Sequence, residues 1–416
     1  MTTAQATAQT GPGALTEPSE EELVGRARGM REELLARQEE AERLTHLPDD
    51  IHEQFVAHGF YDMFVPRTYG GLEVSPRTFF KVCKELARGD MGSAWCFTLA
   101  ANHALHVASW YPKEVQDRAF AGRDFRAASV SAPTVRAERT QDGYVLNGVV
   151  DYCSGIPQST WYLGQCMVEQ EDGSAPVMGM FLAPRDTFER LHNWGESTGL
   201  KATGSESIRF TDAFLTADLV IEDANMIDIP VKDGTVGTRL HGNPMYAGRG
   251  LLTFTVSLAS LAVGGLYHAL DEFERLMRTR KTPLPPVQLR LYDVDYQRHY
   301  GAAWTKIRTA ELALDGVIAQ HAEYCQATVD GTREYTFVDD WSLACVVREI
   351  IIQLWETLQH DLLRVVGSGS MRQGERFDRI FRDMTSLLTH RNPMLREQAF
   401  RNTANLLLEI PPPEAR

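Results

Sequence analysis

The chain has 416 residues, of which 43% are hydrophobic and 24% are charged, an ordinary composition for a soluble globular protein. Its formal net charge of −14 argues against a nucleic-acid-binding protein with a basic face. No apolar run reaches membrane-spanning length, and residues 1–19 lack the apolar core of a signal peptide, so we expect a cytoplasmic protein that binds no membrane.

The N-terminal part has the pattern of a helical domain behind a tail. Residues 1–18 are polar, contain Gly and Pro and show no periodicity, which predicts a disordered tail. Ser19 and Glu22 have the spacing of a capping box, so we expect the first helix to begin there. We assign residues 19–124 to a helical domain. Further helices are expected near residues 49–58, 75–89, 92–109 and 112–120.

The pattern changes near residue 125. Short apolar runs now alternate with turn signals such as QDG at 141–143 and EDGS at 171–174. We therefore expect residues 125–240 to form a middle β domain, a barrel or a sandwich. The candidate strands are AASVSA, YVLNGVVDY, TWYLGQCMV, VMGMFLA and SIRF.

The helical period returns after residue 245. Apolar residues again recur at steps of three and four, as at Leu343, Val347 and Ile350. We expect residues 241–408 to form an up-and-down four-helix bundle, followed by a tail at 409–416. Long helices are predicted near residues 247–279, 287–326, 336–366 and 378–408. The fold class is thus predicted as mostly α with a central β domain.

Two kinds of site are not indicated by the sequence. No two cysteines form a CxxC pair, so neither a zinc ribbon nor a dithiol redox motif is visible, and free buried thiols are expected. No Walker or Rossmann glycine fingerprint is present, so we expect no NAD(P)H site. The six cysteines are Cys83, Cys96, Cys153, Cys166, Cys325 and Cys345.

Five local sequences, in this order, resemble motifs of the acyl-CoA dehydrogenase superfamily. They are VPRTYGG at 65–71, ELARGD with SAW at 85–95, DGYVLNG at 142–148, TGLKATGS at 198–205 and RFDRIFRD at 376–383. The fourth resembles the flavin-phosphate segment of that family. The resemblance extends over residues 20–405, and it implies the same three-part fold, a flavin cofactor and a homotetramer.

This superfamily contains dehydrogenases and oxygenases, and the residues discriminate between them. A dehydrogenase needs a carboxylate base at the substrate α-carbon, which most members place just after the Arg-Asp helix start. Residues 384–391 (MTSLLTHR) contain no carboxylate, and the alternative position, on a helix at 250–265, contains none either. We therefore expect the oxygenase branch, which includes the oxygenase components of 4-hydroxyphenylacetate hydroxylase and related phenol hydroxylases.

Within this branch the resemblance implies three catalytic residues. His390 stands where the hydroxylases place a histidine at the flavin C4a edge, and a neutral-to-cationic imidazole there can protonate and protect a C4a-hydroperoxyflavin. Ser154, beside Gly155, would form a hydrogen bond with flavin N5. His103 would contact a phenolic oxygen of the substrate, although the assignment could shift by one turn to His106. The ordinary alternatives are a helix-surface histidine, a turn serine and a core histidine.

A larger set is predicted to hold the flavin, and FAD is expected, with FMN as an alternative. Hydroxyls and backbone N–H groups around residues 194–205 would hold its ring and pyrophosphate without much charge. Arg278 or Lys281 and the GSGS loop at 367–370 are candidates for the adenosine end, although that loop is equally explained as a turn between helices. The predicted cofactor-binding residues are Ser129, Ser131, Ser154, Gly155, Trp194, Thr203, Ser205, Arg278, Gly367 and Gly369. No metal site is expected.

The resulting hypothesis is the oxygenase component of a two-component monooxygenase. It would use reduced flavin from a separate NAD(P)H:flavin reductase and dioxygen to hydroxylate an aromatic, phenolic small molecule. The alternatives are N-oxygenation of an amine or amino sugar, an acyl-CoA dehydrogenase with a displaced base, and a non-catalytic flavin-binding protein.

Overall fold

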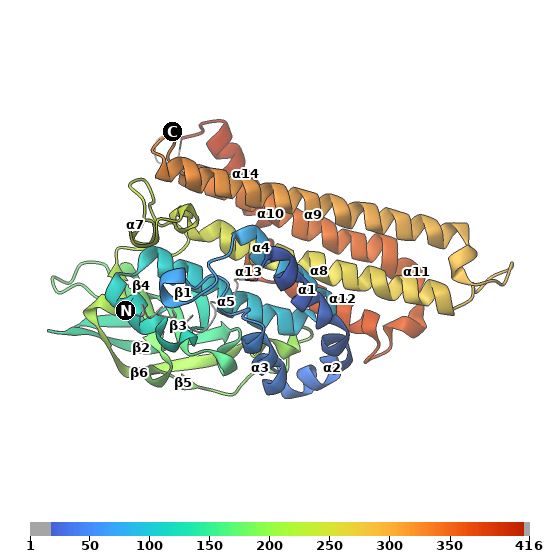
Figure 1. Ribbon diagram of the computed structural model, residues 1–416, viewed down its shortest axis with the longest axis horizontal. Helices are drawn as coiled ribbons and strands as arrows, with labels where there is room; N and C mark the ends of the chain where they lie inside the picture. Colours follow the sequence, from blue (N-terminus) through green and yellow to red (C-terminus); the bar gives the residue numbers. More distant parts are fainter. Residues whose placement is uncertain (1–17, 412–416) are drawn as a thin grey trace, which may run out of the picture.

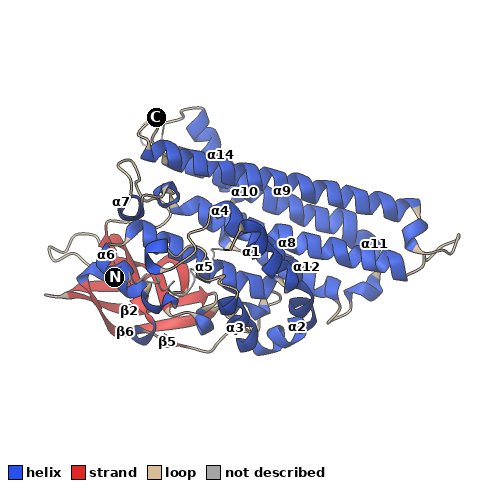
Figure 2. Ribbon diagram, in the orientation of Figure 1, coloured by secondary structure: helices blue, strands red, loops and turns tan. Residues whose placement is uncertain are grey.

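The computed structural model describes residues 18–411 of the chain. Almost all of the predicted disordered N-terminal tail, and the end of the C-terminal tail, lie outside these residues. Figure 1 shows a sheet at one end of the molecule, long helices running along the longest axis, and the N-terminal helices packed beside both. Figure 2 shows that the strands are confined to this one end.

The N-terminal helices begin where predicted. The Ser19 hydroxyl accepts the Glu22 N–H at 3.2 Å, and the Glu22 carboxylate accepts the Ser19 N–H at 2.6 Å, which confirms the capping box. The periodic run that follows is divided into two helices at Met30, whose side chain is buried in the core. The helices are α1 (Glu20–Gly29), α2 (Arg31–Leu44), α3 (Asp49–Ala57), α4 (Pro76–Gly89), α5 (Met91–Trp110) and α6 (Lys113–Ala119).

The strands form a single seven-stranded sheet with the order β5-β6-β2-β1-β3-β4-β7. β1 pairs in parallel with β3, and the other neighbours are antiparallel. The register of β2 against β6 shifts between Val150 and Cys153, directly before Ser154, and such irregularities re-aim side chains. The strands are β1 (Ala127–Arg139), β2 (Gly143–Cys153), β3 (Trp161–Val168), β4 (Val177–Pro184), β5 (Glu189–Arg190), β6 (Glu206–Thr216) and β7 (Val220–Glu222).

The C-terminal part is a bundle in which α8 packs against α9, α10 and α12. The single helix predicted at 378–408 is wrong: α12 ends at Leu388, and His390 begins a new short helix. Pro393 explains the break, because its ring would clash with the carbonyl of Thr389 in a continuous helix. The helices are α7 (Val236–His241), α8 (Gly250–Thr279), α9 (Val294–Val329), α10 (Phe337–Thr357), a π-helical turn (Leu358–Leu363), α11 (Arg364–Val366), α12 (Arg376–Leu388), α13 (Arg391–Met394) and α14 (Arg396–Leu407).

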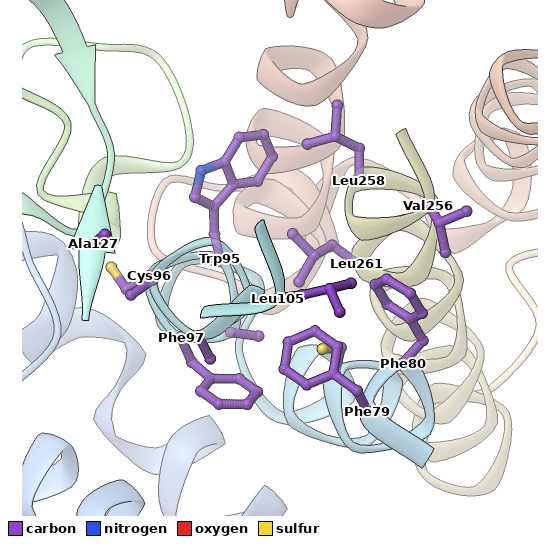
Figure 3. Packing of buried hydrophobic residues seen from close by; sticks show 14 of the residues in the cluster. Phe79, Phe80, Trp95, Cys96, Phe97, Leu105, Ala127, Val256, Leu258 and Leu261 are labelled. Atoms are coloured by element: carbon purple, nitrogen blue, oxygen red, sulfur yellow. The ribbon is translucent and has the colours of Figure 1, made fainter. Parts of the chain in front are cut away.

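One apolar core joins these parts, and α5 runs through it. Figure 3 shows Phe79 and Phe80 of α4, Phe97 and Leu105 of α5, and Leu261 of α8 in this core. By length and composition α8 could cross a membrane, but 89% of its most apolar window is buried inside the molecule, as in the core helix of a globular protein. All six cysteines are buried and free.

The predicted fold class, mostly helical with a central β part, is confirmed by this architecture. The domain boundaries given above stay predictions.

Gly199 offers a test of how the sheet region docks on the bundle. A Cβ at this position would lie 2.1 Å from the carbonyl oxygen of Arg382 in α12, so Gly199→Ala forces two backbone segments apart. We expect the free energy of unfolding to fall by about 1–3 kcal/mol, measured by urea denaturation. Gly301→Ala in α9 meets open space and is the control, which should not be destabilised. Equal stability of both variants would contradict this docking.

Candidate functional site

Three of the predicted hydroxyl side chains meet where β2 ends and β6 begins. The Ser205 Oγ lies 2.8 Å from Ser154 Oγ and 2.7 Å from Thr203 Oγ1, and all three residues are buried. Thr203 donates its proton to the Leu200 carbonyl at 2.8 Å, so its oxygen can accept from Ser205. Ser205 can then accept from Ser154, which leaves the Ser154 oxygen free to accept a further hydrogen bond. We call Ser154, Thr203 and Ser205 the hydroxyl cluster.

The backbone around Ser154 is unusual for non-glycine residues. Tyr152 has a φ of 64°, in the left-handed region, and its side chain is 70% exposed. Gly155 follows with a φ of 74°, and its N–H donates to the Thr203 carbonyl at 2.8 Å. Left-handed conformations of large residues concentrate at functional sites. Tyr152 and Trp194 lie edge to face at 6.0 Å, and Trp194 Nε1 donates to the Lys201 carbonyl at 2.9 Å.

Helix α5 connects the hydroxyl cluster to His390. The Cys96 thiol donates to the Ala202 carbonyl at 3.3 Å, beside Thr203, while the neighbouring Trp95 ring meets the His390 ring edge to face at 5.8 Å. Figure 3 shows Trp95 and Phe97 pointing to opposite sides of α5. Trp95 Nε1 is buried and has no partner within residues 18–411. The sequence did not indicate Trp95 as a site residue, because a tryptophan within an apolar helix is ordinarily explained by packing in the hydrophobic core.

His390 is the N-cap of α13. Its Nδ1 accepts the Asn392 backbone N–H at 3.2 Å, so the proton of the neutral ring is on Nε2. The side chain is accessible to solvent, and the protein packed around it, with a smaller contribution from the Arg391 charge, lowers its pKa below the ordinary histidine value. The structure therefore favours the neutral imidazole at pH 7, not the neutral-to-cationic form expected from the resemblance.

His103 and His106 lie deeper in α5, between β1 and the first turns of α8. His103 Nδ1 donates to the Ala127 carbonyl at 2.5 Å, which leaves Nε2 as an acceptor, and burial lowers the pKa of this ring to about 4. The His106 ring is stacked on Phe254 at 4.4 Å, and its Nε2 lies 2.9 Å from Thr253 Oγ1. His103 Nε2 can therefore accept a hydrogen bond from a ligand, and His106 Nδ1, which has no partner within residues 18–411, is a second candidate.

The two predicted serines of β1 are not part of the hydroxyl cluster in the described chain. The Ser129 hydroxyl faces the Met226 sulfur at 3.9 Å, and Ser131 lies in the irregular stretch of β1 between Val130 and Val135. Both side chains are half-buried.

The glycine loop at 367–370 is held by two arginines that the sequence did not single out. Arg280 donates to Ser370 Oγ at 3.1 Å, and Arg290 donates to the Val366 carbonyl at 3.0 Å. The predicted Arg278 instead pairs with Glu274 one turn earlier in α8. Gly367 and Arg290 line a hollow of about 340 Å³, together with His299 and Arg364. Helix α8 ends at Thr279, so Arg280 lies just beyond it and reaches the loop, whereas Arg278 pairs within its last turns.

A buried carboxyl group and a serine hydroxyl attach the segment 198–205 to α12. The Leu200 N–H donates to Asp383 Oδ1 at 2.6 Å, and the Gly199 N–H donates to Ser386 Oγ at 3.0 Å. Burial, together with the nearby charge of Asp90, raises the pKa of Asp383 to about 7. Since α12 ends just before His390, this attachment fixes the hydroxyl cluster and the histidine relative to one another.

The comparisons with known proteins agree with this arrangement. Residues 17–121 match the family model described as acyl-CoA dehydrogenase, N-terminal domain. The chain is 27% identical over 191 residues to the p-hydroxyphenylacetate 3-hydroxylase oxygenase component of Acinetobacter baumannii, covering 46% of this chain and 44% of that protein. It is 22% identical over 370 residues to a pigment production hydroxylase of Rhodococcus sp., covering 89% and 92%. The matches span about half the length of the first curated relatives.

Solved structures show the same fold. The 3-HSA hydroxylase of a Rhodococcus species superposes with a TM-score of 0.84 at 20% identity, covering 95% of this chain and 99% of that one. XiaF of a Streptomyces species, in complex with FADH2 and glycerol, superposes with a TM-score of 0.85 at 20% identity, covering 95% and 96%. The predicted resemblance to the acyl-CoA dehydrogenase superfamily is thus confirmed. The relatives include several named as oxygenase components of flavin-dependent monooxygenases.

Asp383 provides a test of the buried attachment. An unfolded aspartate has a pKa of about 3.9, and folding raises the pKa of Asp383 to about 7. Between these values the folded state binds more protons than the unfolded state, so the burial of Asp383 costs more stability as the pH rises.

The Asp383→Asn variant keeps an acceptor for the Leu200 N–H without the charge. Relative to the wild type, its free energy of unfolding should rise by on the order of 1–3 kcal/mol between about pH 5 and pH 8. Urea denaturation at both pH values measures this difference. The exposed Asp330→Asn is the control, and a difference for Asp383→Asn that does not change with pH would rule out a buried, titrating carboxyl.

Proposed function

We propose that the chain is the oxygenase component of a two-component flavin-dependent monooxygenase that hydroxylates an aromatic, phenolic small molecule. The observation that carries this proposal is that two neighbouring residues of α5 contact the two parts of the site: Cys96 contacts the Ala202 carbonyl beside the hydroxyl cluster, and Trp95 contacts His390. The names of relatives support the reaction class, among them a FADH(2)-dependent resorcinol hydroxylase oxygenase component of a Rhizobium species.

The residues present fit a reduced flavin. Ser154 keeps an acceptor oxygen, which suits the N5–H group that a reduced flavin carries and an oxidised one lacks. The exposed Tyr152 offers an aromatic face, and Trp95 Nε1, which has no partner within residues 18–411, offers a donor. When bound, reduced flavin would supply the two electrons that activate dioxygen, and dioxygen would supply the oxygen atom that is transferred.

The protein's own groups would control protons and position. His390 holds its proton on Nε2, where it can donate a hydrogen bond to an oxygen atom in the site. His103 offers an unprotonated Nε2 that can accept the hydroxyl hydrogen of a phenol, which would raise the electron density of the aromatic ring. The buried surroundings of α5 exclude water from His103, whereas the His390 side chain is accessible to solvent.

The proposal also includes the identity of the flavin, the assembly, the partner protein and the cellular location. We expect FAD, with FMN as the alternative, and the arginine-lined hollow beside Gly367 is a candidate for the adenosine end of the cofactor. A homotetramer, a separate NAD(P)H:flavin reductase and a cytoplasmic location complete the proposal. The second candidate function is N-oxygenation of an amine, because the acceptor Nε2 of His103 can take an N–H hydrogen as well as an O–H hydrogen.

The reaction class is tested by mixing the anaerobic complex of protein and reduced FAD with oxygenated buffer in a stopped-flow spectrometer. A near-ultraviolet absorbance band that precedes oxidised flavin would support the C4a-hydroperoxyflavin route expected from the resemblance, and candidate phenols should accelerate its decay. Immediate oxidation without such a band would count against an oxygenase. Anaerobic bleaching of oxidised flavin by acyl-CoA thioesters would then favour the dehydrogenase.

Replacement of His390 should separate oxygen consumption from oxygen transfer. In His390→Ala the proton donor is lost, so we expect the hydroxylated product per reduced flavin to fall about 100-fold while reduced flavin and oxygen are still consumed. Product is measured by chromatography and hydrogen peroxide by a coupled assay. The exposed His360→Ala is the control. An unchanged product yield in His390→Ala would remove this residue from the mechanism.

Replacement of Ser154 should change which oxidation state of the flavin binds. Because the Ser154 oxygen accepts a hydrogen bond only from the reduced N5–H, we expect Ser154→Ala to weaken binding of reduced FAD about 10-fold, and that of oxidised FAD much less. Anaerobic and aerobic equilibrium titrations give the two dissociation constants. Ser109→Ala, which removes a buried hydroxyl of α5 that is outside the hydroxyl cluster, should change neither. Equal weakening of both states by Ser154→Ala would refute the acceptor assignment.

A further inference from the structure

The ring of His390 is connected to the interior of the bundle through Asn392. Arg348 of α10 donates its Nε–H to Asn392 Oδ1 at 3.1 Å and to the Asn392 carbonyl at 3.3 Å. The Asn392 side chain donates to Thr255 Oγ1 in α8 at 2.8 Å, and its backbone N–H donates to His390 Nδ1 at 3.2 Å. Asn392 is thereby tied to α8 and α10 while it holds the imidazole.

Burying the Arg348 guanidinium at this position costs free energy. Its side chain is 3% exposed, and among the described residues it forms no ion pair. The Trp341 ring, 5.0 Å from the guanidinium, and the Asn392 oxygens are its immediate partners, and Nη1 has none within the described chain. Burial lowers the pKa of Arg348. Cys345 and the buried Asp340 oppose this lowering only in part. Since a buried cation with no carboxylate in direct contact is costly, a purely structural link between α10 and α13 would be made at a lower cost in free energy by apolar packing.

The direction of these hydrogen bonds determines the state of the histidine. A backbone N–H can only donate, so Nδ1 of His390 must be the unprotonated nitrogen, and the single proton of the neutral ring must be on Nε2. If Asn392 moved, the ring could rotate or take the other tautomer, and Nε2 would then offer a lone pair to an oxygen atom in the site. A lone pair there would repel the oxygen atom that the Nε2–H group attracts.

We propose that Arg348, acting through Asn392, is a positioning residue that fixes His390 in the Nε2–H tautomer and in one orientation. Its effect on oxygen transfer rests on the proposed function. The planar guanidinium suits this position, because its fixed geometry lets one N–H face both oxygens of Asn392, whereas the ammonium of a lysine is a flexible point charge.

The first experiment is a double-mutant cycle. Arg348→Met keeps the volume without the donors, and Asn392→Ala removes the side-chain ties. Each should lower the hydroxylated product per reduced flavin by about 10–100-fold, the usual loss when the partner of a functional histidine is removed. Reduced-FAD affinity should stay within about 2-fold. In a His390→Ala background neither change should lower the product yield further, because the group that they position is gone.

Two variants separate positioning from general packing. Arg396→Met removes another arginine that contacts α10, through Glu349, and it should leave the product yield unchanged. Arg348→Lys should give a yield between those of the wild type and Arg348→Met. If Arg348→Met does not fold, Asn392→Ala carries the test. Additive losses of product in the His390→Ala background would overturn the proposal.

The second experiment does not depend on activity. Solid-state NMR of flavin-free protein with 13C,15N-labelled histidine reports the tautomer of each ring, and His390 is assigned by the signal lost in His390→Ala. We expect the Nε2–H tautomer in the wild type and a mixture of tautomers in Asn392→Ala and Arg348→Met. An Nδ1–H tautomer in the wild type would overturn the proposal even if the chain hydroxylates phenols. The expected tautomers without oxygen transfer by the wild type would support positioning and reject only the proposed function.

Discussion

Helix α5 has almost no exposed face, and this constraint determines where the site residues lie. Nineteen of its twenty residues are buried, so its side chains contact a different neighbour in each direction. Trp95 meets His390, Cys96 meets the Ala202 carbonyl, and His103 meets the Ala127 carbonyl. A shift of this helix would disturb all of these contacts at once. The close packing of the core therefore also fixes the distances within the site.

Buried carboxyl groups form hydrogen bonds with the backbone at the N-terminus of α5 and beside the hydroxyl cluster. Asp90 caps the N-terminus of α5 through the Ser93 N–H, and Asp383 holds the Leu200 N–H beside the hydroxyl cluster. Each carboxyl accepts a backbone donor that would otherwise be unsatisfied, which offsets part of the cost of its burial. The sheet region and the bundle thus meet at directional bonds, and these specify one relative placement more sharply than apolar contacts can.

Much of the fold was predictable from local sequence, and the finer geometry was not. The capping box at Ser19, the change from helical to strand periodicity and the ordered family motifs are local signals. The break at His390 was missed, because the apolar period continues past Pro393 and was given more weight than the proline. Arg280, Trp95 and Asn392 could not be assigned, because their importance depends on partners distant in the sequence. The tautomer of His390 depends on a single backbone hydrogen bond, which no composition or spacing reveals.

The low pKa values of the buried histidines have a consequence for the whole molecule. His103 and His321, both with pKa values lowered by burial to about 4, are uncharged in the folded chain at neutral and mildly acidic pH. In the unfolded chain each would regain the ordinary histidine pKa of about 6.5. Unfolding in mildly acidic solution is therefore accompanied by proton uptake at these rings, and acidification draws the equilibrium toward the unfolded chain. Burial keeps these imidazoles neutral at neutral pH. It therefore also limits how far the pH can fall before the protein unfolds.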